Sequence, residues 1–480
     1  MRSMASRRMG TRTEPLMHIP DLRRHCERRL KALDRERASW LAHWRELSEY
    51  ILPRRGAFLE PLRRTDRGRK LNGGILDSTA ALAARTMASG LMAGLSSPAR
   101  AWFRLGLGSP RLSAVPEVRA WLDDVEARMF QAFARSNLYN ALAVVYEELG
   151  VFGTGAMVVM EDAKETVRAY PLSAGEYWLG ASERLTVNTL YRALPMTVFQ
   201  LVERFGRDAV SLGVRDRYAR GDWDHEVEVV QAIEPNEPVG EEGSSRRPAT
   251  RGLGDNLPIR SVWFERSGAP DTALSVSGYE EFPALCPRWH LMGPDVYGRS
   301  PGMDALPDAK GLQTMQLRFS QALAKMINPP LVAPPSLRGQ HSSQAPGGIT
   351  FVPETQAQSF RSAYEVRVPL DQMTLAIEKR QQAVRAAFYA DLFLMATELK
   401  DVRSATEVAE RREEKLVMLG PVLERLHDDL LEPLIGRVFQ IMSRAGEIPP
   451  PPFAELDGAR LQPFYVSPMS SLQLASATLP

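Results

Sequence analysis

The sequence has little cysteine and no recognisable pattern of metal or cofactor ligands. Its 480 residues include only two cysteines, Cys26 and Cys286, which are far apart and fit no metal-ligand or redox spacing. A reduced, cytoplasmic setting is therefore the default expectation. The seven histidines show no zinc spacing either. We expect neither a metal nor a cofactor.

Motifs for catalysis are also missing. A motor ATPase needs a G-x-x-x-x-G-K-[ST] loop, and Gly153-Thr154-Gly155 is too short and lies between a predicted helix and a strand, the reverse of the required order. A nuclease needs converging carboxylates. The pairs Asp123-Asp124 and Asp428-Asp429 are adjacent on predicted helices, where neighbouring side chains diverge by about 100°. No G-x-S-x-G element supplies a nucleophile, so the sequence predicts a protein that is not an enzyme.

Long apolar runs are absent as well. The most membrane-like stretch, residues 80–95, is interrupted by Arg85 and two glycines. It is shorter than the roughly 20 apolar residues of a spanning helix. Residues 1–15 lack the apolar core of a secretory signal. We expect a soluble protein with no membrane partner.

The net charge of +2 conceals an uneven distribution. Residues 1–70 contain 19 Lys and Arg against 9 Asp and Glu, whereas residues 71–480 contain 41 against 49. A basic segment followed by a mildly acidic body indicates a polyanion or an acidic partner near the N-terminus. For any single arginine there, a solvated helix face is an equally good interpretation.

Apolar periodicity predicts helices through the first 150 residues. The first covers about 20–52, where apolar residues recur at helical steps on one face and Pro53 ends the helix. These apolar residues are Leu33, Trp40, Trp44, Leu47 and Ile51. A second helix is expected after the capping residues Asp77-Ser78-Thr79, a third over about 116–136 and a fourth over about 140–149.

Shorter runs rich in Val, Tyr and Trp follow and predict strands. The expected strands are Ala156–Met160, Thr166–Tyr170, Leu185–Arg192, Glu226–Ile233, Ser261–Glu265 and Ala284–His290. One helix is expected over about 196–205. Residues 235–255 are polar and rich in Gly, Pro and Ser, which indicates a mobile loop.

The last third of the chain predicts helices again. One covers about 304–327, with Met315, Phe319, Ala322 and Met326 on one face, and another covers about 370–395, with Met373, Ile377, Val384, Phe388 and Leu392 on one side. Between them lies a Pro- and Gly-rich excursion with strand candidates at Gly348–Val352 and Tyr364–Val368. A final helix of about 404–445 starts at the capping box Ser404–Glu407 and should kink at Gly420-Pro421 and Pro433. The two helices beside the excursion could form a pillar that needs neighbours for stability, although an ordinary helical domain with a surface insertion fits the pattern too.

Several segments, taken in order, resemble the head-to-tail connecting (portal) family of tailed phages, particularly short-tailed ones. They are Trp44–Arg54, Leu76–Ala81, Leu91–Pro98 with Trp102-Phe103, Tyr297–Pro301 with Ala305–Asp308, Pro329-Pro330, and Thr406–Val408 with Leu419–Pro421 and Glu432–Ile435. Together they cover most of the chain from about 20 to 470. There are two departures: relatives usually continue with more helix after Tyr465–Pro468, and Ser404 stands where a threonine is common, with unchanged capping chemistry.

The resemblance implies a helix-rich α+β portal fold in a ring, usually of twelve subunits, at one capsid vertex. The implied parts are a disordered basic N-terminus (1–19), a wing (20–301), stem helices (302–328 and 370–395), a clip (329–369), a tunnel loop (396–403), a kinked helix (404–445) and a short C-terminal segment (446–480) with a small or absent crown. Such a ring is assembled in the host cytoplasm, becomes part of the virion, and conducts double-stranded DNA during packaging and ejection. The implied partners are the terminase, tail adaptor proteins and the major capsid protein.

A DNA conduit should not hold the duplex too tightly, because each neutralised phosphate adds affinity. A mostly repelling wall with a few basic collars satisfies this requirement. The candidate collar residues are Lys400 and Arg403 in the tunnel loop and Lys379, Arg380 and Arg385 on the second stem helix. For each, a solvated or inter-subunit ion pair is the alternative, and Lys400 has Glu398 and Asp401 beside it.

In the clip, turn-forming residues on an exposed excursion indicate a partner-binding surface. The candidates are Leu337, Arg338, Gly339 and His341, although the 340–344 tip could be a solvent loop without a partner. A capsid or tail protein that forms a ring without conducting DNA is the competing interpretation of the whole chain.

Overall fold

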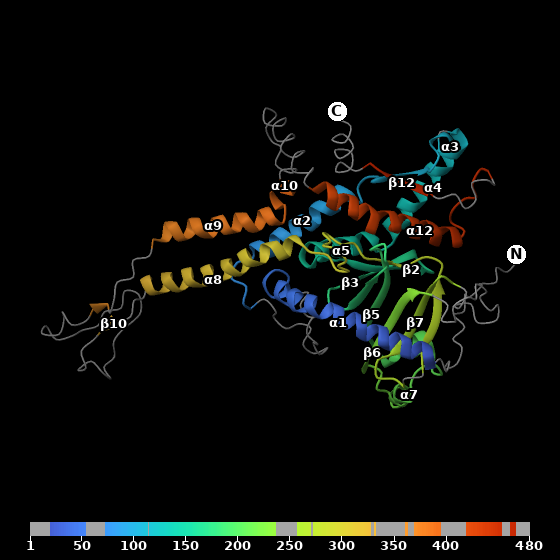
Figure 1. Ribbon diagram of the computed structural model, residues 1–480, viewed down its shortest axis with the longest axis horizontal. Helices are drawn as coiled ribbons and strands as arrows, with labels where there is room; N and C mark the ends of the chain where they lie inside the picture. Colours follow the sequence, from blue (N-terminus) through green and yellow to red (C-terminus); the bar gives the residue numbers. More distant parts are fainter. Residues whose placement is uncertain are drawn as a thin grey trace.

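The computed structural model shows a mixed α+β protein in which two long helices project from a larger body (Figure 1). It describes residues 20–53, 73–113, 115–236, 257–269, 272–327, 331–332, 361–362, 369–394, 419–453 and 461–466. The fold class predicted from the sequence is therefore confirmed at the level of mixed helix and sheet.

Helices from the first third of the chain build most of the main core. They are α1 (Pro20–Tyr50), α2 (Thr79–Leu95), the short α3 (Pro110–Ser113), α4 (Pro116–Arg135) and α5 (Leu138–Phe152). The apolar face predicted for the first helix is buried at Leu33, Trp44, Leu47 and Ile51. The Trp44 indole also donates a 3.1 Å hydrogen bond to the carbonyl of Phe152, so α1 is fixed to the end of α5.

The strands form an antiparallel five-stranded sheet and a smaller three-stranded one. The large sheet has the order β4 (Tyr177–Ala181), β5 (Val187–Thr197), β6 (Glu226–Pro235), β7 (Ile259–Glu265) and β8 (Ser275–Tyr279), and the small one has the order β3 (Thr166–Leu172), β2 (Ala156–Asp162) and β9 (Ala284–Leu285). Two short helices, α6 (Val198–Phe205) and α7 (Leu212–Ala219), lie between β5 and β6 in the chain. A third, two-stranded sheet pairs β1 (Phe103–Leu107) with β12 (Leu461–Tyr465).

Two features of this part differ from the prediction. The strand expected over 284–290 is wrong beyond Leu285, because Pro287 has no amide hydrogen for a ladder and the chain then makes only isolated bridges at Arg288 and His290. Four short strands (β1, β4, β8 and β12) and the short helices α3 and α7 were not predicted. The pairing of Phe103 with Tyr465 joins segments far apart in the chain, which no local pattern reveals.

The first half of α1 packs on the five-stranded sheet through two buried arginines. The Arg23 guanidinium lies 4.0 Å from the centre of the Phe264 ring, and Arg37 lies 4.1 Å from that of Trp178. Both also donate hydrogen bonds to backbone carbonyls of the sheet and its turns, including a 3.0 Å bond from Arg23 to Glu265. Because the charged groups are fully engaged there, α1 is held tightly against this sheet.

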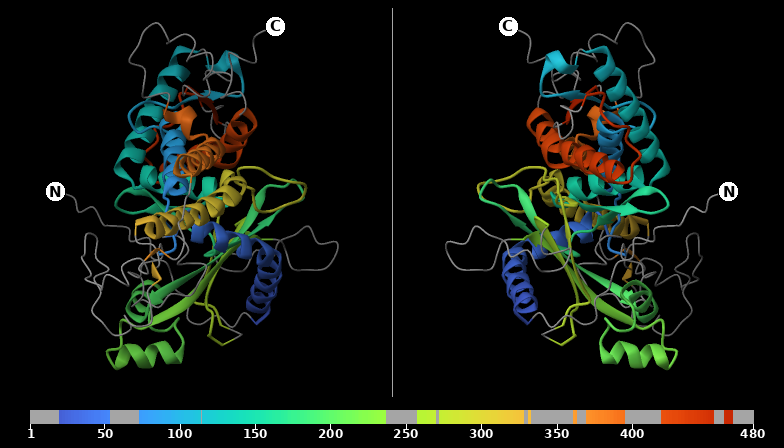
Figure 2. Two further views of the ribbon diagram at one scale, coloured as in Figure 1. Left: turned by 90° about the vertical axis from the view of Figure 1, so that its left-hand side faces the viewer. Right: turned by 90° about the vertical axis from the view of Figure 1, so that its right-hand side faces the viewer.

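The projecting pair consists of α8 (Pro301–Ile327) and α9 (Leu370–Ala387), which run side by side (Figures 1 and 2). We call this pair the pillar. At its far end, β10 (Leu331–Val332) pairs with β11 (Arg361–Ser362). The predicted helix over 370–395 is divided, because α9 ends at Ala387 and α10 (Ala390–Leu394) follows a break at Tyr389, whose φ is 54°. The strand candidates at 348–352 and 364–368 lie outside the described residues.

The helix predicted over 404–445 is described from Leu419 onward. It is α-helical over 419–426, π-helical over His427–Leu431 and α-helical again in α12 (Glu432–Arg444). The π-helical turn ends two residues before Pro433, where a kink was predicted, since proline cannot donate the helical hydrogen bond. Residues 404–418, with the predicted capping box, lie outside the described part.

Candidate functional site

The base of the pillar is fixed to the end of α5 by a close backbone crossing. Gly153 ends α5 with a φ of 81°, and a Cβ atom built on it would lie 2.1 Å from the carbonyl oxygen of Gly298. The Gly298 amide donates a 2.8 Å hydrogen bond to Oγ1 of Thr154, and the Ser300 hydroxyl donates a 2.7 Å bond to the carbonyl of Val151. Glycine at 153 and 298 therefore permits α8 to start directly against α5.

A buried glutamine fixes the direction of the pillar. Gln313 on α8 is 6% exposed. Its Oε1 accepts hydrogen bonds from the amides of Leu76 (2.7 Å) and Asp77 (2.9 Å), and its Nε2 donates to the Asp77 carbonyl at 2.7 Å. Gln381 on α9 donates a 2.8 Å bond to the Asp77 carboxylate. Both pillar helices are thus attached to the turn before α2, which we call the 76–77 turn.

The two pillar helices cover each other only in part. The predicted inner face of α9 is buried at Ile377, Val384 and Phe388. On α8, Met315 and Phe319 are half-buried, but burial decreases toward the far end, where residues 323–327 are all exposed. The large apolar side chains exposed on the pillar are Leu317 (43%), Leu323 (37%), Met326 (39%), Ile327 (69%) and Leu375 (52%). Three of them, Leu317, Leu323 and Ile327, fall within an arc of about 120° on α8, and we call these three the exposed apolar flank.

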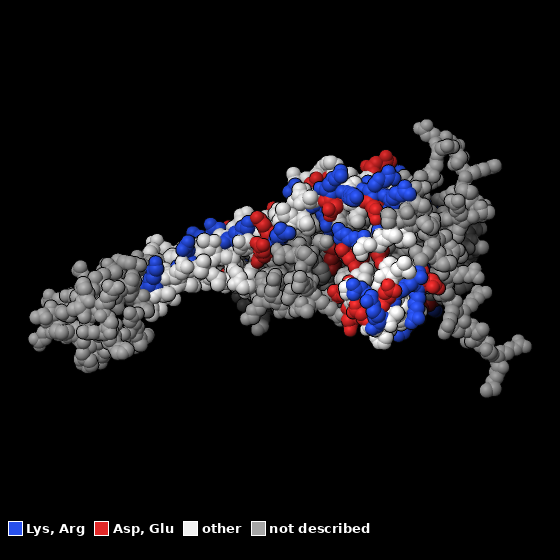
Figure 3. Space-filling model, turned by 90° about the horizontal axis from the view of Figure 1, so that it is seen from below, with Lys and Arg blue, Asp and Glu red and all other residues white. Residues whose placement is uncertain are grey.

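A second flank of α8 is basic. From Ala309 to Ile327 this helix has three basic residues, Lys310, Arg318 and Lys325, and no acidic one. Their spacing places them within an arc of about 80° on α8, and Lys310 makes a 2.6 Å ion pair with Glu46 of α1. On the face of the pillar that Figure 3 shows, basic and uncharged side chains lie along the length and acidic ones lie near the body. The sequence analysis missed this flank, although the lack of acidic residues over so long a helix is a signal that could have found it.

The predicted collar residues on α9 lie in different surroundings. Arg380 makes a 3.1 Å ion pair with Asp308 of α8 and covers Gly311, where a Cβ atom would lie 2.3 Å from Nη1. It therefore links the two pillar helices within one chain. Lys379 and Arg385 are exposed, and neither makes an ion pair with another described residue.

The other predicted site residues lie outside the described part of the chain. They are Lys400 and Arg403 of the tunnel loop and Leu337, Arg338, Gly339 and His341 of the clip.

The last described residues before the predicted tunnel loop pack closely on the body. The Phe393 ring covers Gly90 of α2, where a Cβ atom would lie 2.1 Å from Cδ1 of Phe393. The Tyr389 ring lies 6.1 Å from that of Trp289. Burial raises the pKa of Tyr389, so its hydroxyl stays neutral. Tyr389 and Phe393 are therefore fixed to the body.

Arginines attach the helix that follows positions 395–418 to the small sheet. Arg288 makes a 3.2 Å ion pair with Asp429 in the π-helical turn. Arg437 and Arg444 of α12 both pair with Glu281, at 2.5 and 3.0 Å. The described residues on the two sides of positions 395–418 are thus attached to the same body.

His427 in the same turn stacks on Tyr465, with ring centres 4.0 Å apart. Burial lowers the pKa of His427 to about 4. The imidazole is therefore neutral at pH 7, and the stack joins the π-helical turn to β12.

No group of side chains in the described ranges has the composition of a metal site. Across the same ranges, every helix is too short or too polar to cross a membrane. What the geometry provides is a long two-helix projection with one apolar and one basic flank.

Comparison with known proteins gives concordant matches over nearly the whole chain. The family described as bacteriophage head to tail connecting protein matches residues 23–479. The chain is 44% identical over 445 residues to the probable portal protein of Bordetella phage BPP-1, a match that covers 92% of this chain and 78% of that protein. It is 42% identical over 450 residues to the portal protein of Salmonella phage epsilon15, covering 93% of this chain and 79% of that protein.

Proposed function

The chain belongs to the bacteriophage head to tail connecting protein family, and we propose that its copies form a ring at one capsid vertex that conducts double-stranded DNA. Members of this family are structural, non-enzymatic components of the phage virion. The proposed ring passes DNA inward during packaging and outward during ejection.

The exposed apolar flank of the pillar is the observation that carries this proposal. Leu317, Leu323 and Ile327 are 37–69% exposed on one side of α8. Fully burying a large apolar side chain is worth about 1.5–3 kcal/mol, so covering these partly exposed ones contributes a few kcal/mol per interface. A second copy of the pillar supplies a matching apolar surface. Head-to-tail contacts of this kind produce a closed ring when the rotation between copies closes. Twelve copies are the number that we propose from the family.

The basic flank then suits the inside of the ring. Lys325 and Arg318 on α8, with Lys379 and Arg385 on α9, become collars of charge when repeated by symmetry, and such contacts guide phosphates without reading sequence. We propose that Lys400 and Arg403 of the tunnel loop belong to the same set. The mild acidic excess of residues 71–480 keeps the rest of the wall from holding the duplex.

We propose roles for the remaining parts from the resemblance to the family. We assign the wing to 20–301, the stem to 302–328 and 370–395, the clip to 329–369, the tunnel loop to 396–403 and the kinked helix to 404–445. The clip, at the far end of the pillar, docks the terminase motor first and tail adaptor proteins later, with Leu337, Arg338, Gly339 and His341 as contacts. The wing meets the major capsid protein.

Replacement of Lys400 and Arg403 by alanine tests the conduit. Rings should still assemble, whereas the length or the retention of packaged DNA should change, because a charge collar is lost in every subunit. The matched control replaces Arg217 and Arg266 by alanine, since both are exposed and pair with carboxylates on the surface of the wing. Unchanged packaging and retention in the first variant would remove the proposed collar.

A further inference from the structure

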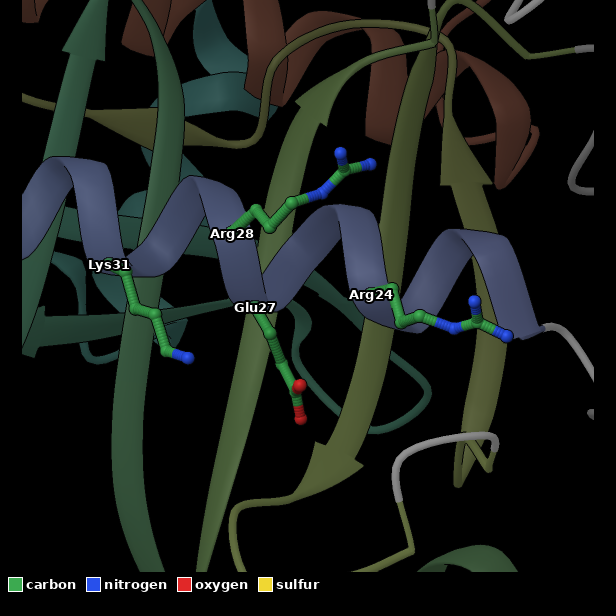
Figure 4. A pocket seen from close by; sticks show the side chains of 4 residues that line it. All are labelled: Arg24, Glu27, Arg28 and Lys31. Carbon is green, nitrogen blue, oxygen red and sulfur yellow. The ribbon is translucent and has the colours of Figure 1, made fainter.

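A ridge of basic side chains runs along the outer side of α1, far from the pillar. Arg24, Arg28, Lys31 and Arg35 follow one another at steps of four, three and four residues, and all four are exposed. At 3.6 residues per turn they fall within an arc of about 60°. Three of them, together with Glu27, line a surface hollow of about 310 Å³ (Figure 4). We call these four residues the α1 ridge.

Carboxylates next to the ridge are engaged with the inner side of the helix. Glu27 accepts a 2.8 Å hydrogen bond from the buried Arg23. Asp34 pairs with the buried Arg37 at 3.2 Å and accepts a 2.7 Å hydrogen bond from the Trp178 indole. Arg23 and Arg37, which hold α1 on the sheet, are therefore paired with the carboxylates that would otherwise neutralise the α1 ridge.

The ridge keeps an excess of positive charge as a result. Within the described part of the chain, Arg28, Lys31 and Arg35 make no ion pair. The positive charge extends beyond the ridge in sequence, because residues 1–19 contain four arginines and one acidic residue.

The chemistry of the ridge favours phosphate over a protein partner. Protein interfaces bury an apolar centre, but none of the large exposed apolar side chains belongs to the described residues of α1. Arginine supplies three of the four ridge residues, and its planar fork of N–H donors matches phosphate oxygens. The ridge spans about 16 Å at 1.5 Å per residue, which corresponds to about five phosphates of one strand of a duplex.

We propose that the α1 ridge binds the phosphate backbone of double-stranded DNA, without sequence specificity, on the outside of the ring. The choice of DNA as the polyanion rests on the proposed function, which brings packaged duplex next to this protein. The ridge lies over the five-stranded sheet, at the end of the molecule away from the tip of the pillar (Figure 1). It is therefore separate from the conduit and holds a duplex that lies against the wing.

A closed circular duplex tests this proposal, because a covalently closed circle cannot be threaded through a channel. The full-length protein is titrated with such a circle between 50 and 200 mM salt. The test variant carries Arg28→Gln, Lys31→Gln and Arg35→Gln. Its affinity should fall at least about tenfold at 0.1 M salt, and the slope of log K against log salt should become shallower by up to about 2.7, or 0.9 for each lost phosphate contact.

Two control variants separate this effect from net charge and from folding. The variant Arg168→Gln, Arg217→Gln and Arg266→Gln removes the same charge from exposed surface ion pairs and should bind the circle as the wild type does. A variant with Arg28→Lys and Arg35→Lys keeps the ridge charge and should keep most of the salt slope.

Three results would overturn the proposal. The first is that the ridge variant binds the circle as the wild type does. The second is that the charge-control variant loses as much affinity for the circle as the ridge variant does. The third is that the ridge variant keeps its affinity for DNA but no longer binds poly-glutamate. The last would identify an acidic protein as the partner. If the Lys400 and Arg403 variant has a packaging or retention defect but still binds the circle as the wild type does, the result supports the α1 ridge as a DNA-binding surface separate from the conduit.

Discussion

The amide of Gln313 should control how firmly the pillar is attached to the body. Replacement by alanine removes three hydrogen bonds of 2.7–2.9 Å and leaves the amides of Leu76 and Asp77 without their acceptor. An unsatisfied buried donor costs about 1–3 kcal/mol. Because these amides are only part-buried and water can reach them, we expect the Gln313→Ala variant to lose about 2 kcal/mol of local stability. A loss of that size corresponds to about a 30-fold loss of protection against hydrogen exchange.

Amide exchange measured at Leu76 and Asp77 reads this effect directly, since these are the donors that Gln313 binds. The matched control is Gln321→Ala, because Gln321 lies on the same helix, is exposed and only accepts a hydrogen bond from Arg318. Exchange at the 76–77 turn should be unchanged in the control. Equal protection of the two amides in the Gln313→Ala protein and the wild type would refute the role given to Gln313.

Three further predictions concern backbone conformation and charge. Gly298→Ala should destabilise the fold by about 3 kcal/mol or more in thermal unfolding, because the new Cβ atom would lie 2.2 Å from a backbone oxygen. The control variant Gly436→Ala should be neutral or stabilising, because there is open space around Gly436. Tyr389 has a φ of 54°. The Tyr389→Gly protein should therefore be more stable than the Tyr389→Ala protein by about 1 kcal/mol in the same assay, since both variants lose the ring and only glycine accepts the left-handed conformation easily. Equal stabilities of the two variants would contradict the assigned strain. The pKa of His427 is lowered to about 4 in the folded protein, so stability that is present above pH 6.5 should be lost as the pH falls toward 4. A His427→Phe variant should show a flatter profile over that range in pH-dependent denaturation, and an identical slope would count against a buried neutral imidazole.

The helical repeat of apolar residues correctly predicted the long helices and their buried faces, because this repeat lies within each helix. The inner face of α9, at Ile377, Val384 and Phe388, is buried as predicted, because a helical stripe must face the body or the partner helix. The long helices α1, α4, α5 and α8 were predicted within a few residues for the same reason.

What the sequence did not reveal depends on contacts between distant segments. Gln313 is indistinguishable in sequence from the exposed glutamines of α8, and only its position beside Asp77, 236 residues away, makes it a structural residue. Arg23 and Arg37 were assigned to a basic segment, yet both are buried against aromatic rings of the sheet. The basic flank of α8 was not predicted because Lys310, Arg318 and Lys325 are eight and seven residues apart and form no cluster in the sequence.

In the proposed ring, the exposed apolar flank of α8 is covered by identical copies around an open axis. End-on electron microscopy of the purified full-length protein tests this arrangement. We predict a ring with an axial hole wide enough for a duplex and with the α8 flank at each boundary between subunits. A monomer that is stable in solution, or a disc closed at its centre, would exclude such a ring.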